Sequence, residues 1–372
     1  MTELAPLSET VLPDGVRARF VEGVNGLRMH LLEAGHEGRR RPLVLLLHGF
    51  PELAYSWRKV LPALAEAGYH AVAPDQRGYG RTTGWDGDYD GDLASFRPFN
   101  LVRDLMGLLA GLGRDAVAAV VGHDFGAPVA AWAALLRPDV FQRLVLMAGP
   151  VAGPPTLRAE AGPPTRDVHA ALAALKRPRK HYQWYYSTRQ ADADMLRCPQ
   201  GLPAFLRAYY HQKSADWAAN RPLPLAGWTA EELARLPSYY VMDLHRDMAE
   251  TVAAGPQGGP APWLTDAELA VYAGEYARTG FQGGLQWYRC ATERVLMAEQ
   301  EIWSGRPIQV PATFIAGAAD WCVQQSPGAL ERMRTRALAR LDGVHILAGA
   351  GHWVQQEQAG AVNRLLVDFL GR

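Results

Sequence analysis

The chain has 372 residues, of which 48% are hydrophobic and 20% charged, and its 38 basic residues balance 38 acidic ones. This composition is typical of a globular protein with a large apolar core, and the balanced charge argues against a nucleic-acid or acidic-membrane surface. Three scattered cysteines argue against a disulfide framework and a structural zinc site. We therefore expect a soluble cytoplasmic protein with no signal peptide and no membrane span.

The first part of the chain alternates short apolar runs with helix-length segments. Residues 16–33 have the alternating pattern of a hairpin. A helix is predicted most clearly over residues 101–112, where five leucines share one face. Apolar runs bounded by Gly, Pro or Asp predict buried parallel strands at 43–47, 71–73, 117–121 and 144–147. This order of elements predicts a doubly wound, mostly parallel α/β sheet.

A Gly/Pro-rich passage that begins at Gly149 ends this rhythm. The region after it is rich in Trp, Tyr, Leu and Ala, and helices are predicted there at 229–236 and 266–279. Two further strands, at 312–316 and 344–347, and an amphipathic helix at 361–370 complete the sheet. We expect a core made of residues 1–150 and 305–372, with residues 151–304 inserted as a helical cap.

The segment from Val120 to Ala127 carries the strongest chemical signal, because a buried strand passes there directly into a helix predicted at 128–136. Glycines at 122 and 126 permit the tight bend that raises residue 124 above the sheet, as in a nucleophile elbow. The residue at this bend is Asp124. A helix N-terminus favours its charged form, which suits a nucleophile, although an aspartate that only caps a helix would give the same pattern.

Two later residues complete a set of three. Asp320 and His352 each follow a predicted strand, and open α/β sheets place their sites at the carboxyl ends of strands. The order Asp124, Asp320, His352 is that of the α/β-hydrolase triad. After the first parallel strand, the backbone N–H of Phe50 could form an oxyanion hole with that of Phe125.

These segments resemble the α/β-hydrolase-fold epoxide hydrolases over nearly the whole chain. The resemblance is strongest over residues 40–150 and 305–370 and weaker in the cap. Its motifs are HGFPE at 48–52, YSWRKVLPALAEAGYHAVAPDQRGYG at 55–80, GHDFGA at 122–127 and GAGHW at 349–353. The resemblance implies an α/β-hydrolase fold with a cap and an aspartate nucleophile.

The family also implies two cap tyrosines that act as acids. KHYQWYY at 180–186 is similar to the segment of the first, and GFQGGLQWYR at 280–289 to that of the second, which makes Tyr182 and Tyr288 the candidates. Tyr185, Tyr186 and His181 compete for the first position. Residues at the junction of cap and core are predicted to contact the substrate, namely Pro51, Trp184, Trp287 and Trp353.

An aspartate nucleophile limits the chemistry. Serine attack on an sp³ carbon would leave an ether, whereas carboxylate attack leaves an ester that a His-activated water can hydrolyse. This favours an alkyl electrophile, either an epoxide or an alkyl halide. A departing halide needs N–H donors, which the side chains of Phe50 and Phe125 lack, while an opening epoxide needs an acid such as tyrosine.

The sequence therefore predicts an epoxide hydrolase that forms a vicinal diol through an Asp124 ester, hydrolysed by water that His352 and Asp320 activate. A haloalkane or haloacid dehalogenase with the same triad and a ligand-binding protein with little turnover remain as alternatives. We expect no cofactor and no metal, since dinucleotide, P-loop and metal-ligand spacings are missing. The expected partners are a small apolar epoxide and water, with no nucleic acid or membrane, and the protein is expected to be a monomer or homodimer.

Overall fold

The computed structural model describes residues 4–37, 41–157 and 167–372, so residues 158–166 of the Gly/Pro-rich passage lie outside the described part. An eight-stranded sheet forms its centre, with the strand order β1-β2-β4-β3-β5-β6-β9-β10. Its strands are β1 Val16–Val24, β2 Leu27–Ala34, β3 Leu43–Leu47, β4 His70–Pro74, β5 Ala119–His123, β6 Leu144–Met147, β9 Ala312–Gly317 and β10 Leu341–Leu347.

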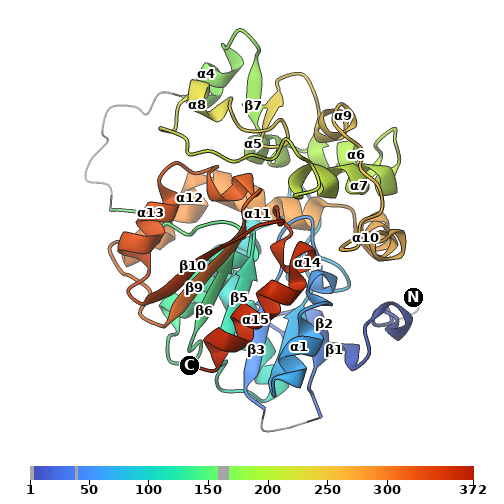
Figure 1. Cartoon of the computed structure of the whole chain (residues 1–372), viewed down its shortest axis with the longest axis vertical. Coiled ribbons are helices and arrows are strands. Elements are labelled where there is room, and N and C mark those ends of the chain that lie inside the picture. The colour runs from blue at the N-terminus through green and yellow to red at the C-terminus, as the bar shows by residue number, and fades with distance from the viewer. Residues whose placement is uncertain (1–3, 38–40, 158–166) are drawn as a thin grey trace.

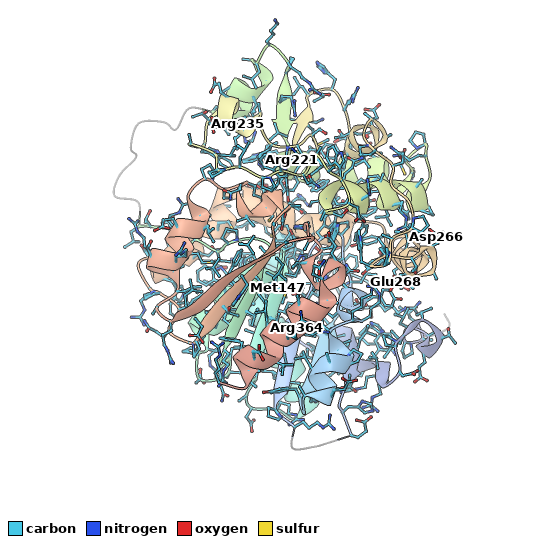
Figure 2. The ribbon with its side chains drawn as sticks, in the orientation of Figure 1. Met147, Arg221, Arg235, Asp266, Glu268 and Arg364 are labelled. Atoms are coloured by element: carbon cyan, nitrogen blue, oxygen red, sulfur yellow. The ribbon has the colours of Figure 1, made fainter. Side chains whose placement is uncertain are left out.

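The direction of the strands sets where a site can form. The β1–β2 hairpin is antiparallel and β2 pairs antiparallel with β4, whereas β4, β3, β5, β6, β9 and β10 run parallel. In the register, Leu47 lies beside Gly122, and Met147, at the centre of the sheet in Figure 2, lies beside His123. The segments that follow β3, β5, β9 and β10 therefore emerge at one edge.

Helices cover this sheet. Helices α1 and α15 contact each other, and Figure 1 shows them side by side in front of the strands. Helix α2 begins with Pro98 at its N-terminus and ends at Gly113, whose φ of 64° gives the left-handed C-cap that glycine favours. The core helices are α1 Leu61–Glu66, α2 Pro98–Leu112, α3 Gly126–Leu136, α13 Ala329–Arg332, α14 Val354–Glu357 and α15 Ala359–Leu370.

Nine α-helices and a two-stranded sheet lie between β6 and β9 within the described residues. In Figure 1 most of them lie above the edge where the parallel strands end. They are α4 Val168–Ala173, β7 Arg179–His181, α5 Tyr182–Tyr186, α6 Gln190–Leu196, α7 Leu202–Lys213, α8 Ala230–Leu233, β8 Val241–Asp243, α9 Met248–Ala253, α10 Asp266–Thr279, α11 Gln282–Thr292 and α12 Arg294–Met297. Near the start of α10, Glu268 pairs with the buried Arg58 of the core at 2.8 Å (Figure 2).

The fold class predicted from the sequence is confirmed, and most elements fall where expected. Strand β5 begins two residues later than predicted and runs on to His123, next to Asp124. Helix α8 ends earlier than predicted, four residues before Pro237, whose ring disfavours helix at the residue before it. The pair β7–β8 was not predicted, because three-residue strands have too short a pattern. The limits at residues 150 and 304 stay a prediction.

No helix in the described ranges combines the length and the apolar character needed to cross a bilayer.

Candidate active site

Asp124 occupies a strained turn between β5 and α3. Its φ is 49°, a left-handed conformation that is unusual outside glycine. The tight bend requires glycine at position 122, because a Cβ there would lie 2.2 Å from the carbonyl oxygen of Gly126. The turn therefore presents the Asp124 carboxylate at the carboxyl edge of the sheet, as the sequence predicted.

The two oxygens of the Asp124 carboxylate face different partners. Oδ1 accepts a hydrogen bond from the backbone N–H of Phe50 at 2.9 Å, and Oδ2 lies 3.4 Å from Nε2 of His352. Burial by itself would raise the pKa of Asp124, but the hydrogen bond and charge of His352 and the charge of Lys213 outweigh it and hold the pKa well below its usual value. The carboxylate is therefore ionised, and its two oxygens have separate partners.

His352 lies between two carboxylates. Its Nδ1 is 3.1 Å from Oδ2 and 3.2 Å from Oδ1 of Asp320, which follows β9 and also accepts the backbone N–H of Cys322. Burial and the charge of Lys213 lower the pKa of His352, but Asp320 and Asp124 outweigh them and raise it to about 9. The imidazole is therefore charged at neutral pH and oriented by Asp320. The structure brings Asp124, Asp320 and His352 together.

A second histidine, His123, links the segment that carries Asp124 to the loop that carries His352. Nδ1 of His123 lies 2.5 Å from Oε2 of Glu52, and its Nε2 lies 2.8 Å from the carbonyl oxygen of His352. Glu52 also accepts the N–H of Gly49 and the side-chain amide of Gln355. The His123 ring therefore bridges the Glu52 side chain and the backbone of His352, and it links the His352 loop to the strand that precedes Asp124.

Glu357 holds the backbone on either side of His352. Its Oε2 accepts the N–H groups of Ala215 and Gly351 at 2.8 and 2.9 Å, and its Oε1 accepts that of Trp353 at 3.0 Å. Burial raises the pKa of Glu357 to about 7, even though these three donors favour the charged form. The N–H of His352 itself donates to the carbonyl oxygen of Lys213 at 2.8 Å. The loop of the base is thus attached to the end of α7.

Two buried tyrosines of the cap approach Asp124 from the other side. Tyr182 begins α5 and Tyr288 lies in α11, and their ring centroids are 5.8 Å apart. The Tyr288 ring also packs edge-on against Phe125 at 4.5 Å. Burial raises the pKa of both phenols well above 10, and the negative charge of Asp124 raises both further. Both hydroxyls therefore carry their protons and can act as donors.

The competitors for the first acid point elsewhere. The Tyr185 hydroxyl donates to Asp194 at 2.8 Å, and that of Tyr186 donates to the Tyr209 hydroxyl at 3.2 Å. His181 accepts the N–H of Gln183 at 3.4 Å and caps α5, and burial together with His169 lowers its pKa to about 3. The Tyr182 hydroxyl makes a long 3.3 Å contact with Gln325. This geometry favours Tyr182 as the first acid.

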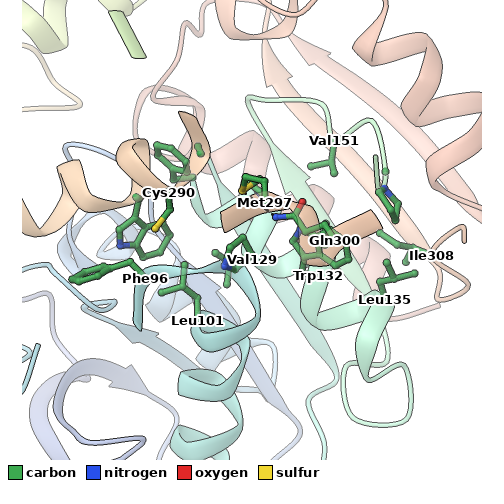
Figure 3. A pocket seen from close by; sticks show the side chains of 18 residues that line it. Phe96, Leu101, Val129, Trp132, Leu135, Val151, Cys290, Met297, Gln300 and Ile308 are labelled. Atoms are coloured by element: carbon green, nitrogen blue, oxygen red, sulfur yellow. Dashed lines mark hydrogen bonds between the residues drawn. The ribbon is translucent and has the colours of Figure 1, made fainter. Parts of the chain in front are cut away.

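An apolar cavity of about 230 Å³ is lined by Phe125, the residue after Asp124, whereas Asp124 and His352 are not among its lining residues. Phe125 and Trp287 form its inner wall, and Figure 3 shows Val129 and Trp132 facing Met297 and Gln300 across it. The indole N–H of Trp287 is taken up by the carbonyl oxygen of Arg77 at 2.9 Å. The cavity thus offers almost only carbon surface, with the Gln300 amide as its polar exception.

The other predicted substrate contacts are not part of this cavity. Trp184 packs against His169 and His181 in the cap. Trp353 is fully buried, and its indole N–H donates to the carbonyl oxygen of Tyr210. Pro51 is also buried, and its carbonyl oxygen accepts the Tyr210 hydroxyl. These three positions stay predictions as substrate contacts.

Three side chains at the site could also bind a cation. Asp124, Cys322 and His352 each place one ligand atom within 4.8 Å of the others. His352 is protonated, and burial together with the charges of Asp320 and Asp124 raises the pKa of the Cys322 thiol well above its usual value. Both groups would have to lose a proton before they could bind a metal, so this set is poorly suited to a resident ion.

Comparisons with known proteins agree with this geometry. A family model described as alpha/beta hydrolase fold matches residues 42–359. Epoxide hydrolase A of Mycobacterium tuberculosis is 37% identical over 297 residues, which cover 80% of each chain. Epoxide hydrolase B of the same organism is 35% identical over 362 residues, 93% of this chain and 96% of the relative.

Solved structures give the same result. An epoxide hydrolase from an endophytic Streptomyces superposes with a TM-score of 0.77, at 34% identity and over 96% of both chains. Epoxide hydrolase I of potato, Solanum tuberosum, superposes with a TM-score of 0.73, at 30% identity, over 96% of this chain and 99% of that one. The chain is an α/β-hydrolase-fold protein. It belongs to the epoxide hydrolase family of that fold.

The sequence did not single out several residues around the site. Lys213, Tyr209 and Glu357 carry no recognisable motif, and only the structure shows them beside the triad. Glu52 ends the HGFPE motif, and its spacing of two residues from Phe50 was the one signal that could have pointed to it.

Proposed function

We propose that the protein hydrolyses epoxides to vicinal diols through a covalent ester on Asp124. The observation that carries this proposal is the placing of one ionised carboxylate between a charged histidine and two protonated phenols. A nucleophile for carbon and acids for an oxygen leaving group thus meet in one buried site.

In the first step, the hydroxyls of Tyr182 and Tyr288 hydrogen-bond the epoxide oxygen while Oδ2 of Asp124 attacks one ring carbon. The new Oδ2–C bond replaces the C–O bond of the ring, whose electron pair stays on the epoxide oxygen. That oxygen takes a phenolic proton. The high pKa of both phenols suits this role, because the proton leaves only when an alkoxide forms.

In the second step, neutral His352, oriented by Asp320, takes a proton from water as the water attacks the ester carbonyl. Oδ1 becomes the oxyanion, and it already accepts the N–H of Phe50 at 2.9 Å. The N–H of Phe125, at the N-terminal end of α3, is the second proposed donor. Collapse of the tetrahedral intermediate releases the diol and restores the carboxylate.

The substrate class follows from the cavity beside Phe125. Its volume of about 230 Å³ and its apolar lining fit an alkyl or aryl substituent of the epoxide rather than a charged one. In this proposal residues 151–304 act as the cap that carries the acids, over a core of residues 1–150 and 305–372.

A dehalogenase with the same triad is less well supported. A departing halide needs free N–H donors near the nucleophile, yet Phe125 and Phe50 offer only carbon side chains and the indole N–H of Trp287 is already bonded to Arg77. The two Mycobacterium tuberculosis relatives are epoxide hydrolases by name.

Intact mass spectrometry of His352→Gln tests the proposal, because loss of the base should stall the ester. The variant is exposed to a mixed panel of epoxides and alkyl halides, with Asp124→Ala/His352→Gln as the matched control. An adduct equal to a whole epoxide, missing in the control, is expected. A mass gain equal to the alkyl halide minus one hydrogen halide would show a dehalogenase. No mass gain with any compound would favour a binding protein.

A further inference from the structure

Lys213, the last residue of α7, is a buried cation beside the triad. Only 4% of the residue is exposed, and the hydrogen bond of its ammonium group is a long one, 3.4 Å from the Tyr209 hydroxyl. Among the described residues no carboxylate lies within ion-pair distance of it. Four aromatic rings surround Nζ instead, with centroids at 5.1 Å for Tyr209, 5.9 Å for Tyr239, 5.0 Å for Tyr240 and 5.6 Å for Trp353.

An ammonium group in such a place needs an explanation. Removing it from water is costly, and the faces of aromatic rings recover only part of that cost. Burial lowers the pKa of Lys213, but the neighbouring Tyr209, Asp124, Cys322 and Asp320 outweigh it and raise the pKa, so the lysine stays charged. The groups that stabilise the charge are therefore those of the site rather than a structural partner.

The lysine is linked to both sides of the site. Its carbonyl oxygen accepts the N–H of His352 at 2.8 Å. Its ammonium contacts the Tyr209 hydroxyl, which lies 3.2 Å from the Tyr186 hydroxyl, and the Tyr186 ring packs 4.9 Å from that of Tyr288. Lys213 is thus placed between the base in the core and the phenols of the cap.

The number of charges around the His352 imidazole changes during the reaction, although the set of charged and titratable residues there is fixed. They are Asp124 on the turn after β5, His123 on β5, Asp320 and Cys322 after β9, and Lys213 on α7. In the free enzyme two anions beside the imidazole, Asp124 and Asp320, outweigh the one cation, Lys213. Once Asp124 is an ester, one anion and one cation remain.

We propose that Lys213 is a positioning residue that makes His352 release its proton when Asp124 becomes an ester, so that the base is ready only in the intermediate. This inference rests on the proposed function. The protons balance: the opened oxygen takes a phenolic proton, the phenolate takes the proton of His352, and water later returns one to His352 as the ester is cleaved. Lys213 keeps its proton throughout.

Lys213→Met tests the role because methionine keeps the length and apolar packing but removes the charge. Lys180→Met is the matched control, since Lys180 also lies in the cap over a tyrosine ring, 4.9 Å from the centroid of Tyr185. Decay of the alkyl-enzyme is followed in single turnovers between pH 5.5 and 9. In Lys213→Met we expect the rising limb to move up by about one pH unit, with decay slower by up to about tenfold at pH values on that limb.

A readout without substrate separates this inference from the proposed function. In Asp124→Asn, which is neutral like the ester, the His352 imidazole is titrated by NMR, with its signal identified by loss in His352→Gln. We expect Lys213→Met to raise this pKa by about one unit and Lys213→Arg to restore it. Lys213→Gln serves as the neutral variant if methionine does not fold. An unchanged titration, or a loss of stability with the pH profile intact, would overturn the role of Lys213 even if epoxides are turned over.

Discussion

The two halves of the site are held in different ways. In the core, Asp124, Asp320 and His352 stand at the ends of parallel strands, and backbone N–H groups, carboxylates and one strained φ fix their side chains. In the cap, Tyr182 and Tyr288 are held mainly by edge-on ring contacts. Hydrogen bonds fix direction within narrow limits, whereas ring contacts tolerate small shifts. The core half is therefore the rigid one, and the cap half is the adjustable one.

Asp124, the proposed nucleophile, belongs to the rigid half, and its loss should give the largest effect. We expect Asp124→Ala to lower turnover by at least about 10³-fold, since no ester can form. The fold should persist, because Cβ remains in the turn. Turnover and thermal unfolding measure the two effects, with the exposed Asp115→Ala as the control. Substantial turnover in Asp124→Ala would place the nucleophile outside the core half.

A cap acid should affect only one step. We expect Tyr288→Phe to slow alkyl-enzyme formation by about 10²-fold and to leave ester hydrolysis nearly unchanged, because the phenol protonates only the opening oxygen. Rapid-quench kinetics with mass detection separates the steps. Tyr185→Phe, whose hydroxyl bonds Asp194 instead, is the matched control. Equal slowing of both steps would mean that the tyrosine supports the site as a whole.

Glu357 lies where the halves join, and its removal should have an intermediate effect. Glutamine replaces one of the two carboxylate oxygens of Glu357 with an NH₂ group, which cannot accept a hydrogen bond. The N–H of Gly351 or that of Trp353 therefore loses its acceptor, and the His352 loop should loosen. We expect ester hydrolysis to slow about tenfold, corresponding to about 1.4 kcal/mol of lost alignment. Single-turnover decay of the ester measures it. Faster decay would contradict a role in alignment.

The same variant gives a pH test of stability. The folded-state pKa of Glu357 is raised to about 7 from a reference of 4.5, so the stability that its proton contributes is complete below pH 4.5 and is lost as the pH rises through 7. Glutamine cannot ionise. The free energy of unfolding of the wild type, measured in urea, should therefore fall more than that of Glu357→Gln between pH 4.5 and 8, and parallel curves would disprove the shift.

Filling the cavity should give the smallest effect, confined to certain substrates. Ala131 lines the cavity from α3, and Ala131→Phe should lower kcat/KM for epoxides with long apolar substituents by about tenfold while short ones keep their value. Ala110→Phe, at an exposed position of α2, is the control. An equal loss for short and long substrates would show that the cavity holds no substituent.

The core half could largely be predicted from the sequence because its signals are local. Gly122, Asp124 and Gly126 lie within five residues, and each triad member directly follows an apolar run that predicts a strand. Their order along the chain was then enough to predict that these three residues lie together, since parallel strands end at one edge of the sheet. The two candidate cap acids, Tyr182 and Tyr288, came from the resemblance to a family rather than from any pattern in the residues.

The supporting residues around the site could not be predicted in this way. Lys213 has one partner on its own helix, Tyr209, but the other three rings around it come from two distant segments. Glu357 follows His352 by five residues, a spacing with no meaning until the loop is folded. Trp184 was predicted from its aromatic character alone, but packing turns its ring toward His169. Contacts of this kind depend on tertiary packing, which leaves no period in the sequence.

The end of α7 has a consequence for exchanging caps between relatives. Its terminal carbonyl oxygens, those of Tyr210 and Lys213, accept the indole N–H of Trp353 and the backbone N–H of His352. A chimera that imports a foreign cap also imports the acceptors on which the base depends. The cap should therefore be exchanged together with the loop around His352. A chimera that exchanges the cap alone would put the His352 loop against acceptors from another protein.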